Sequence, residues 1–480
     1  MRKQRFLALP TAAAATIIGA TALTPAVAAP TAGQAATPAF HNTADFNGDG
    51  YPDLAVSADT AAVGEVDRAG MISVQYGSAT GLRDKAALIS RDTAGVPGEP
   101  ARDQPFGRIS GQGDVDHDGY TDLLVRDTQG LLMLRGGKDG LTGRDSGQIK
   151  HGSRTPDGSY LSPDKAAVGD VTGDGVPDIL TTASENGFDH KLAVFQGPFN
   201  FATDKPAAVQ IRHVNKLDDL RVMALFVADM TGDGIADVVA TGFYGGVVYK
   251  GGPAGLTPVG VVKGHNTGTF GDVNGDGFQD FIGAEGLYMD KEGGRIHVTY
   301  GGPKMARALS DVLTYNQDSP GVPGVAEKDD RWGQALTAGD TDGDGYADVV
   351  VGAPWETGTD ATATHQSGSI TLLRGSASGI TGTGSKALTQ NSAGIPSTSE
   401  RLDHFGAATT LLDANKDGKP ELYVSGYGED AYKGRVWKLK TDATGVTGTG
   451  ATSYSLSDLG GPAGRTHFGW GFGNGTAVVF

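Results

Sequence analysis

Short apolar runs recur along the chain, each next to a glycine-rich acidic stretch. They read "LAVS", "LLVR", "ILTT", "VVAT", "FIGA", "VVVG" and "LYVS", and they begin at residues 54, 123, 179, 238, 281, 349 and 422. Runs this short, rich in Val, Ile and Leu and bounded by turn residues, predict buried β-strands. A second apolar run that ends in glycine follows, for example "ISVQYG" and "ITLLRG". Because no long helical periodicity accompanies these runs, the pattern predicts an all-β protein.

The acidic stretch is itself a nine-residue repeat, D-x-[DNT]-x-D-G-x-x-[DE]. It occurs seven times, starting at residues 45, 114, 170, 229, 272, 340 and 413. Units of about 40 to 70 residues with about four short strands have the size of one propeller blade. A lone four-stranded sheet cannot bury both faces, whereas seven sheets packed radially can. We therefore predict a seven-bladed β-propeller of four-stranded blades over residues 40–480.

The two ends of the repeat region indicate how the ring closes. Phe106-Gly107, Trp332-Gly333 and Phe405-Gly406 precede acidic stretches; Phe468-Gly469 matches them, but no acidic stretch follows it. The first unit, conversely, has only a short segment before its acidic stretch. We expect the C-terminal strand to close the first blade. A degenerate eighth blade is the alternative.

The spacing of the acids within each stretch suits a calcium ion, which takes six to eight oxygen ligands. In a curved, extended loop, side chains at positions 1, 3, 5 and 9 converge, and the position-7 carbonyl adds a ligand. Glycine at position 6 permits the sharp turn. An EF-hand begins in the same way but needs a bidentate Glu at position 12, which here falls inside a strand. The acid at position 9 is expected to replace it.

We number these stretches loops one to seven in chain order and call them the acidic loops. With Thr at position 3, loops three and four are expected to bind metal more weakly. The candidate metal ligands are Asp45, Asn47, Asp49, Tyr51 and Asp53; Asp114, Asp116, Asp118, Tyr120 and Asp122; Asp170, Thr172, Asp174, Val176 and Asp178; Asp229, Thr231, Asp233, Ile235 and Asp237; Asp272, Asn274, Asp276, Phe278 and Asp280; Asp340, Asp342, Asp344, Tyr346 and Asp348; and Asp413, Asn415, Asp417, Lys419 and Glu421.

Charge and cysteine content support the metal hypothesis. The acidic loops hold 23 of the 56 acidic residues of a chain whose formal net charge is −17. Like charges this close would repel strongly, so we expect up to seven Ca²⁺ ions. A single copy could also be an Asx-rich turn without metal. The chain has no Cys, so metal would supply the cross-links that disulfides supply elsewhere. The negative charge also argues against a nucleic-acid partner.

The N-terminal segment predicts export. Arg2, Lys3 and Arg5 precede an Ala-rich apolar run that ends in "AVA" at residues 26–28. We interpret residues 1–28 as a signal peptide and residues 29–39 as a flexible linker. No second long apolar stretch follows, so we expect a secreted, extracellular monomer without a membrane span.

The segments "RWGQALTAGDTDGDGYADVVVGAP" (331–354) and "PFGRISGQGDVDHDGYTDLLV" (105–125) resemble the FG-GAP repeats of integrin α-subunit propellers and of secreted bacterial relatives. The resemblance implies calcium in the loop between the first two strands of each blade, on the lower face. It also implies ligand binding on the upper face, through the loops that join the second and third strands.

The upper loops therefore hold the speculative ligand-binding residues. Trp355, Glu356, Tyr288, Tyr427 and Tyr432 are suited to sugar rings or to the side chains of a partner, although such aromatics also pack under their own loops. Neither G-x-S-x-G nor H-E-x-x-H occurs, and we assign no catalytic residue. The leading hypothesis is a secreted, non-enzymatic calcium-binding module for adhesion to, or interaction with, a protein or glycan. The alternatives are a polysaccharide-active lyase or hydrolase, or a lectin, on the same propeller.

Overall fold

The computed structural model describes residues 44–473, apart from residues 105, 186–190, 215–221, 244, 265–266, 286–292, 307–308 and 358–364. The expected signal peptide and linker lie outside the described residues. So do Tyr288 and residues 474–480 of the expected closing strand.

The described chain forms seven antiparallel sheets of consecutive strands, which we call blades one to seven. Their strands are β1 (Leu54–Ala58), β2 (Met71–Gln75) and β3 (Ala86–Ile89); β4 (Arg108–Gly113), β5 (Asp122–Asp127), β6 (Gly130–Leu134) and β7 (Gly147–Lys150); β8 (Tyr160–Gly169), β9 (Asp178–Ser184), β10 (Lys191–Gln196) and β11 (Ala208–His213); β12 (Ala224–Ala228), β13 (Asp237–Gly242), β14 (Gly245–Lys250) and β15 (Thr257–Val262); β16 (Thr267–Gly271), β17 (Asp280–Ala284), β18 (Ile296–Thr299) and β19 (Leu313–Tyr315); β20 (Ala335–Gly339), β21 (Asp348–Ala353), β22 (Ser369–Arg374) and β23 (Thr381–Leu388); and β24 (Thr409–Leu412), β25 (Glu421–Gly426), β26 (Arg435–Asp442) and β27 (Gly445–Tyr454).

Helical structure is minor. The 3₁₀ turn η1 spans Leu309–Asp311, and the short helix α1 spans Glu429–Tyr432. Within the described ranges, no helix has the length and apolar character needed to cross a membrane.

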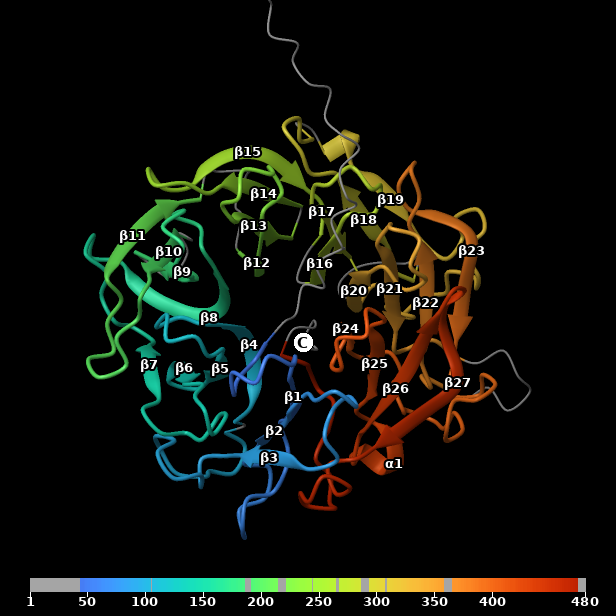
Figure 1. Cartoon of the computed structure of the whole chain (residues 1–480), viewed down its shortest axis with the longest axis horizontal. Coiled ribbons are helices and arrows are strands. Elements are labelled where there is room, and N and C mark those ends of the chain that lie inside the picture. The colour runs from blue at the N-terminus through green and yellow to red at the C-terminus, as the bar shows by residue number, and fades with distance from the viewer. Residues whose placement is uncertain are drawn as a thin grey trace, which may run out of the picture. The chain divides into compact units, whose positions relative to one another are not determined.

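The seven blades surround a common centre (Figure 1). In most blades the first strand lies nearest the centre and the last strand at the rim. Neighbouring inner strands contact one another from β4 through β8, β12, β16 and β20 to β24. The prediction of a seven-bladed β-propeller is therefore confirmed. Six of the blades have four strands, and the first has three among the described residues.

The strand that follows each acidic loop is buried at all or all but one of its residues. β1, β17 and β21 are buried at every residue. A strand in the middle of a blade that packs between two other blades is covered on both faces, so its apolar residues run continuously rather than in alternation. The predicted buried strands are thereby confirmed.

Each pair of neighbouring blades shares an apolar core. Seven clusters of buried side chains each combine residues of two adjacent blades. The cluster that joins the last blade to the first packs Leu54 and Val56 of β1 against Leu412 of β24 and Tyr423 of β25. Apolar packing therefore continues around the whole ring.

Four aromatic-glycine pairs each connect a blade to the one before it. Phe106, Trp332, Phe405 and Phe468 are fully buried. The Phe405 N–H donates to the Ser367 carbonyl of the preceding blade at 2.9 Å. Gly368 beside it has φ +88°, and a Cβ there would lie 2.1 Å from the Phe405 oxygen. Only glycine allows this approach of two backbones.

The C-terminal part of the described chain lies against the first blade. Val56 and Phe472 form an antiparallel bridge. The N–H of Ser57 donates to the Gly471 carbonyl (2.9 Å), and the N–H of Gly473 donates to the Ala55 carbonyl (2.9 Å). These bonds occupy the edge of β1 where a fourth strand would pair. Because residues 474–480 lie outside the described residues, closure by a full strand stays a prediction.

Candidate metal-binding loops and upper-face cluster

The acidic loops share one hydrogen-bond frame. In loop one, Asp45 accepts the N–H of Asp49 (3.1 Å) and the N–H of Gly50 (2.7 Å), and Asp49 accepts the N–H of Tyr51 (3.0 Å). The same three bonds recur in the other six loops at 2.7 to 3.2 Å. The position-1 carboxylate therefore shapes the turn in every loop.

The position-9 aspartate anchors each loop to the blade. Asp53 accepts the N–H of Phe46 and the N–H of Gly77, both at 2.8 Å. The equivalent pair of bonds is present in loops two to six, and these carboxylates are at most 1% exposed. In loops one, two and five each carboxylate oxygen accepts one of these bonds and keeps a lone pair for a cation. Position 9 is thus a structural anchor as well as a candidate ligand, which the sequence did not reveal.

Burial raises the pKa of the position-9 carboxyls. The pKa rises to about 7 for Asp53, to about 8 for Asp122 and to about 7 for Asp280, because these groups are removed from water and face other carboxylates. The two N–H donors to each group act in the opposite direction. A nearby cation would favour the ionised form of all three.

Loop seven differs from the others at the position-9 anchor, where Glu421 replaces the aspartate. The Glu421 carboxylate pairs with Lys438 Nζ at 3.2 Å, and its Oε2 is buried without a hydrogen-bond partner. A glutamate reaches one methylene further than an aspartate, so the loop ends differently here.

Acidic oxygens converge most closely in two loops. One ligand atom from each of Asp114, Asp116 and Asp122 lies within 4.8 Å of the others, and so do atoms of Asp340, Asp342 and Asp344. These are the two loops with Asp at position 3. The other five loops have Asn or Thr there. In loop one the Asn47 amide donates to Asp49 at 3.1 Å, so this side chain also lies among the acids.

Basic side chains reach five of the acidic loops, which sequence reasoning missed. Three of them immediately precede the glycine whose N–H binds position 9, and this position is the signal that could have revealed them. The ion pairs are Arg83 with Asp49 (2.9 Å), Arg135 with Asp116 (2.6 Å) and Asp118 (3.0 Å), Lys250 with Asp233 (2.7 Å), Arg374 with Asp342 and with Asp348 (3.1 Å), and Lys438 with Glu421 (3.2 Å).

These ion pairs reduce the like-charge repulsion on which the sequence-based calcium hypothesis partly rested. Arg374 is the most buried of them, with a side chain 13% exposed against acids that are 9% and 0% exposed. Among the described residues, no such pair is seen for loops three and five. Gln196 and Tyr300 stand there in place of the arginine or lysine.

A cavity of about 650 Å³ adjoins loop two. Asp116, Arg135, Phe199, Phe201 and Lys205 are among its lining residues. The Arg135 guanidinium lies over the Phe201 ring at 5.6 Å while it pairs with the loop, so part of this polar wall is already neutralised.

The opposite edge of the propeller, which we call the upper face, carries the loops between the second and third strands. There an aromatic group, the upper-face cluster, assembles from Trp355, His404, Tyr427, Tyr432, His467 and Trp470. The rings of His404 and Tyr427 stack at 4.7 Å, and Tyr427 meets Trp470 edge-on at 4.9 Å. Trp355 lies 6.4 Å from His404, and Tyr432 lies 5.5 Å from His467.

Arginines cover the cluster. Arg331 lies 3.3 Å from the centre of the Trp355 ring, and Arg465 lies 4.5 Å from that of Tyr432. Of the predicted ligand residues, the structure thus brings Trp355, Tyr427 and Tyr432 together. Tyr427 is only 5% exposed.

Glu356 is directed elsewhere, since it accepts a hydrogen bond from Gln317 at 2.7 Å.

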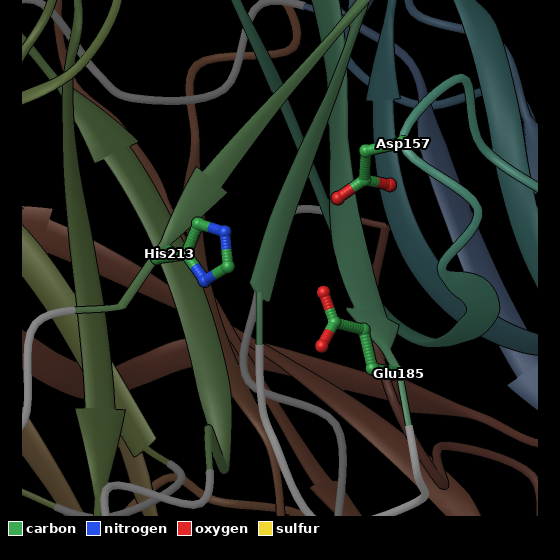
Figure 2. Close-up of side chains that lie close together, drawn as sticks. All are labelled: Asp157, Glu185 and His213. Atoms are coloured by element: carbon green, nitrogen blue, oxygen red, sulfur yellow. The ribbon is translucent and has the colours of Figure 1, made fainter.

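A further acidic group lies on the upper face of blade three (Figure 2), where Asp157, Glu185 and His213 point toward one another. The Lys191 ammonium, 1% exposed, pairs with Asp157 (2.8 Å) and with Glu185, and it donates to Ser159 (2.9 Å). The hydrogen bond from Lys191 holds the pKa of Asp157 well below its usual range. The Lys191 ammonium therefore already neutralises part of the negative charge of Asp157 and Glu185.

Comparison with known proteins agrees with this architecture. The FG-GAP repeat model matches residues 42–74 and 332–373, and the FG-GAP-like repeat model matches residues 114–181. The chain therefore carries FG-GAP repeats. It is 30% identical over 176 residues to integrin alpha-5 of Xenopus laevis, a match that covers 34% of this chain and 15% of that protein.

Two further relatives match shorter or weaker stretches. Integrin alpha pat-2 of Caenorhabditis elegans is 27% identical over 203 residues, covering 39% of this chain and 15% of its own length. Phosphatidylinositol-glycan-specific phospholipase D of Mus musculus is 33% identical over 111 residues, covering 22% and 12%. The matched regions therefore span only about one seventh of these relatives or less.

Among solved structures, the chain is similar to an Agrocybe aegerita lectin that specifically recognises non-reducing terminal N-acetylglucosamine. The TM-score is 0.43 with 13% identity, over 85% of this chain and 92% of the lectin. Likeness of this degree says nothing about the ligand of this chain.

Proposed function

We infer that the protein is an exported, calcium-stabilised β-propeller that acts as a non-enzymatic binding module for a protein or glycan ligand. The observation that carries the metal assignment is the repetition of one hydrogen-bond frame in seven acidic loops. The side chains gathered there offer oxygen donors alone, which is the set that hard cations such as calcium prefer.

The residues that fit the ion are the side chains at positions 1, 3, 5 and 9 and the carbonyl at position 7. When bound, calcium would supply positive charge and tie the beginning of each loop to its end. Loop five gains most from an ion, because no arginine or lysine of the described chain pairs with it and its position 3 is Asn274 rather than threonine.

Removal of metal tests this assignment. A ligand that binds only the folded state stabilises it by mass action. Excess chelator should therefore lower the melting temperature of the purified chain, and calcium should restore it more effectively than magnesium at the same concentration. Unfolding curves that coincide with and without chelator would refute metal binding by the loops.

The upper-face cluster supports the binding role. Flat aromatic rings stacked with guanidinium groups suit sugar rings and the aromatic or charged side chains of a partner. Trp355 and Tyr432 are half-buried, so each offers part of a ring to solvent. The cluster also draws on several blades, as a specific binding surface requires.

A glycan panel screened with the calcium-loaded chain, followed for both binding and release of products, tests the binding role. Trp355→Ala should weaken binding about tenfold or more, since loss of a central aromatic commonly costs over 1.4 kcal/mol. The matched control is Tyr160→Ala on blade three. Its ring also stacks with an arginine, Arg154, at 4.4 Å, and is 42% exposed. Equal affinity of both variants would refute this surface.

The second candidate is a polysaccharide lyase, favoured by the meeting of tyrosine, histidine and arginine side chains in one cluster. A lyase needs a general base with a suitable pKa beside a positive charge. Burial, however, raises the pKa of Tyr427 far above neutrality and lowers that of His404 to about 4. Product formation in the screen would favour the lyase over the binding module.

A further inference from the structure

The connection from blade five to blade six contains a buried acidic group that the acidic loops do not explain. One ligand atom from each of Glu327, Asp330 and Glu356 lies within 4.8 Å of the others. Asp330 is 2% exposed, and Glu356 is half-buried. Glu327 is exposed and leaves the group open to solvent. Three carboxylates therefore face one another away from the acidic loops.

A buried amide completes this group. Gln317 is 3% exposed, and its Nε2 donates to Glu356 at 2.7 Å. Its carbonyl Oε1 is buried without a hydrogen-bond partner. A buried acceptor without a donor is costly. Because Oε1 belongs to the amide whose Nε2 binds Glu356, this oxygen lies near the Glu356 carboxylate, where a cation would satisfy it.

The connection from blade six to blade seven has the same three residues in the same roles. Gln390 Nε2 donates to Glu429 at 2.6 Å, and Asp403 corresponds to Asp330. The carbonyl of each aspartate accepts an upper-loop N–H, from Trp355 at 3.2 Å and from Gly428 at 3.1 Å. The Gln390 carbonyl Oε1 is likewise buried without a hydrogen-bond partner, so the two junctions share this feature. They differ in that Arg435 Nε lies 3.7 Å from Glu429.

Blade six differs at the position of that arginine. Arg435 follows Gly434, and the residue that follows the equivalent Gly368 is Ser369. The seventh blade therefore supplies its own positive charge to the acids, and the sixth has a short hydroxyl there.

The two remaining junctions with this geometry need no cation. Between blades seven and one, the equivalent residues are Leu456, Thr466 and Ala61, all at most 1% exposed. Between blades one and two, Arg91 replaces the glutamine and pairs with Asp127 at 2.6 Å. The junction of blades seven and one therefore has no charged group at these positions, and at the junction of blades one and two the arginine neutralises the aspartate. Of the four junctions compared, the junction of blades five and six is the one with several acids and no equivalent of Arg435.

We propose that a divalent cation of calcium's chemistry binds at the junction of blades five and six. Its ligands are the carboxylates of Glu327, Asp330 and Glu356 and the carbonyl oxygen of Gln317. All are hard oxygen donors, and water can complete the shell from the side of Glu327.

The ion would connect the rim of blade five to the upper loop of blade six. Gln317 lies two residues beyond the outer strand β19, and Glu356 adjoins Trp355 of the upper-face cluster. Binding at this junction would thus fix the position of Trp355. The inference does not depend on whether the acidic loops bind metal.

Terbium luminescence excited through tryptophan tests the site, with the chain loaded with Tb³⁺ alone as the probe. Trp355 adjoins Glu356, whereas none of the acidic loops contains tryptophan and loops one, two and six contain tyrosine. Tryptophan-excited emission should therefore report the junction, and tyrosine-excited emission these three loops. Calcium should compete with both signals.

Glu356→Gln should lower the Tb³⁺ affinity measured by tryptophan-excited emission roughly tenfold or more, because one charged ligand is lost. The matched control Glu429→Gln, at the junction that has Arg435, should leave it unchanged. Asp330→Asn is the second variant should Glu356→Gln fail to fold, which circular dichroism reports. An unchanged signal in both junction variants, or an equal loss in Glu429→Gln, would overturn the proposal. Tryptophan-excited emission without tyrosine-excited emission from the Tb³⁺-loaded chain would refute metal binding by the tyrosine-bearing acidic loops and would still support the junction site.

Discussion

Loop five allows the anchoring and the metal-binding roles of an acidic loop to be separated. Asp280 at position 9 is fully buried and accepts the N–H of Val273 (3.0 Å) and that of Gly301 (2.9 Å). Asp276 at position 5 is exposed and accepts the N–H of Phe278 at 3.0 Å. Both are candidate ligands of the same ion, but only the first holds the loop to the blade.

Replacing each aspartate by asparagine should therefore have different effects without metal. Asparagine has one acceptor oxygen, so Asp280→Asn leaves one buried N–H unpaired, at a cost of about 1 to 3 kcal/mol. Asp276→Asn keeps the bond from the Phe278 N–H and loses only the exposed bond from the Asn274 amide, so it should change the unfolding free energy by less than about 0.5 kcal/mol. With a pKa of about 7, Asp280 is about half ionised at neutral pH in the metal-free chain, so the replacement removes about half a charge.

With calcium present, both variants should lose stability. An ion at 100 times its dissociation constant stabilises the folded state by about 2.7 kcal/mol, and loss of either ligand removes much of this. Urea unfolding of both variants in calcium and in chelator measures the four values. Equal losses for the two variants in chelator would refute the anchoring role of position 9. An unchanged Asp276→Asn variant in calcium would refute the ligand role of position 5.

Three further predictions address the blade contacts, pH and the loop cations. Gly368→Ala should destabilise the chain by about 3 kcal/mol in urea unfolding, because its Cβ would meet the Phe405 backbone at a positive φ. The control Gly152→Ala, with φ +71° and nothing within 4 Å, should cost far less. The buried neutral His404 has a pKa of about 4, so the unfolded chain takes up a proton first as pH falls. The His404 contribution to stability, fully present above pH 6.5, should drop by about 3 kcal/mol towards pH 4. The difference in unfolding free energy between the unchanged chain and His404→Gln should therefore change by this amount over that pH range in unfolding curves. Arg374→Gln should raise the calcium affinity of loop six about tenfold in calorimetric titration, since a charged competitor is removed; an unchanged affinity would show that the arginine does not compete.

The repeated part of this fold could be predicted from the sequence because its determinants are local. An apolar run after each acidic loop, a glycine at position 6 and an aromatic-glycine pair all lie within a few residues of the feature they specify. Phe405 and Phe468 were expected at blade openings, and both are buried there. Seven copies of one pattern made these local signals unambiguous.

The remainder depends on contacts between residues far apart in sequence. Arg374 reaches Asp348 over 26 residues and Gln317 reaches Glu356 over 39. Such pairs follow from the register between strands and from the packing of one blade on the next, which local patterns do not encode. The pair of hydrogen bonds that the position-9 aspartate accepts was not predicted for the same reason, because one donor, the N–H of Gly77, lies 24 residues after Asp53.

The two edges of the propeller differ in how much they repeat, and this difference bears on function. At the lower edge the same three hydrogen bonds recur in all seven loops, so that edge is built for one task performed seven times. At the upper edge the equivalent junction positions vary: Gln317 and Gln390 donate to glutamates, Arg91 pairs with an aspartate, and Leu456 packs in an apolar cluster. A surface that varies from blade to blade on a constant frame can distinguish one ligand from another, whereas a repeated one cannot. Stability is therefore expected to depend on the lower edge and ligand specificity on the upper edge.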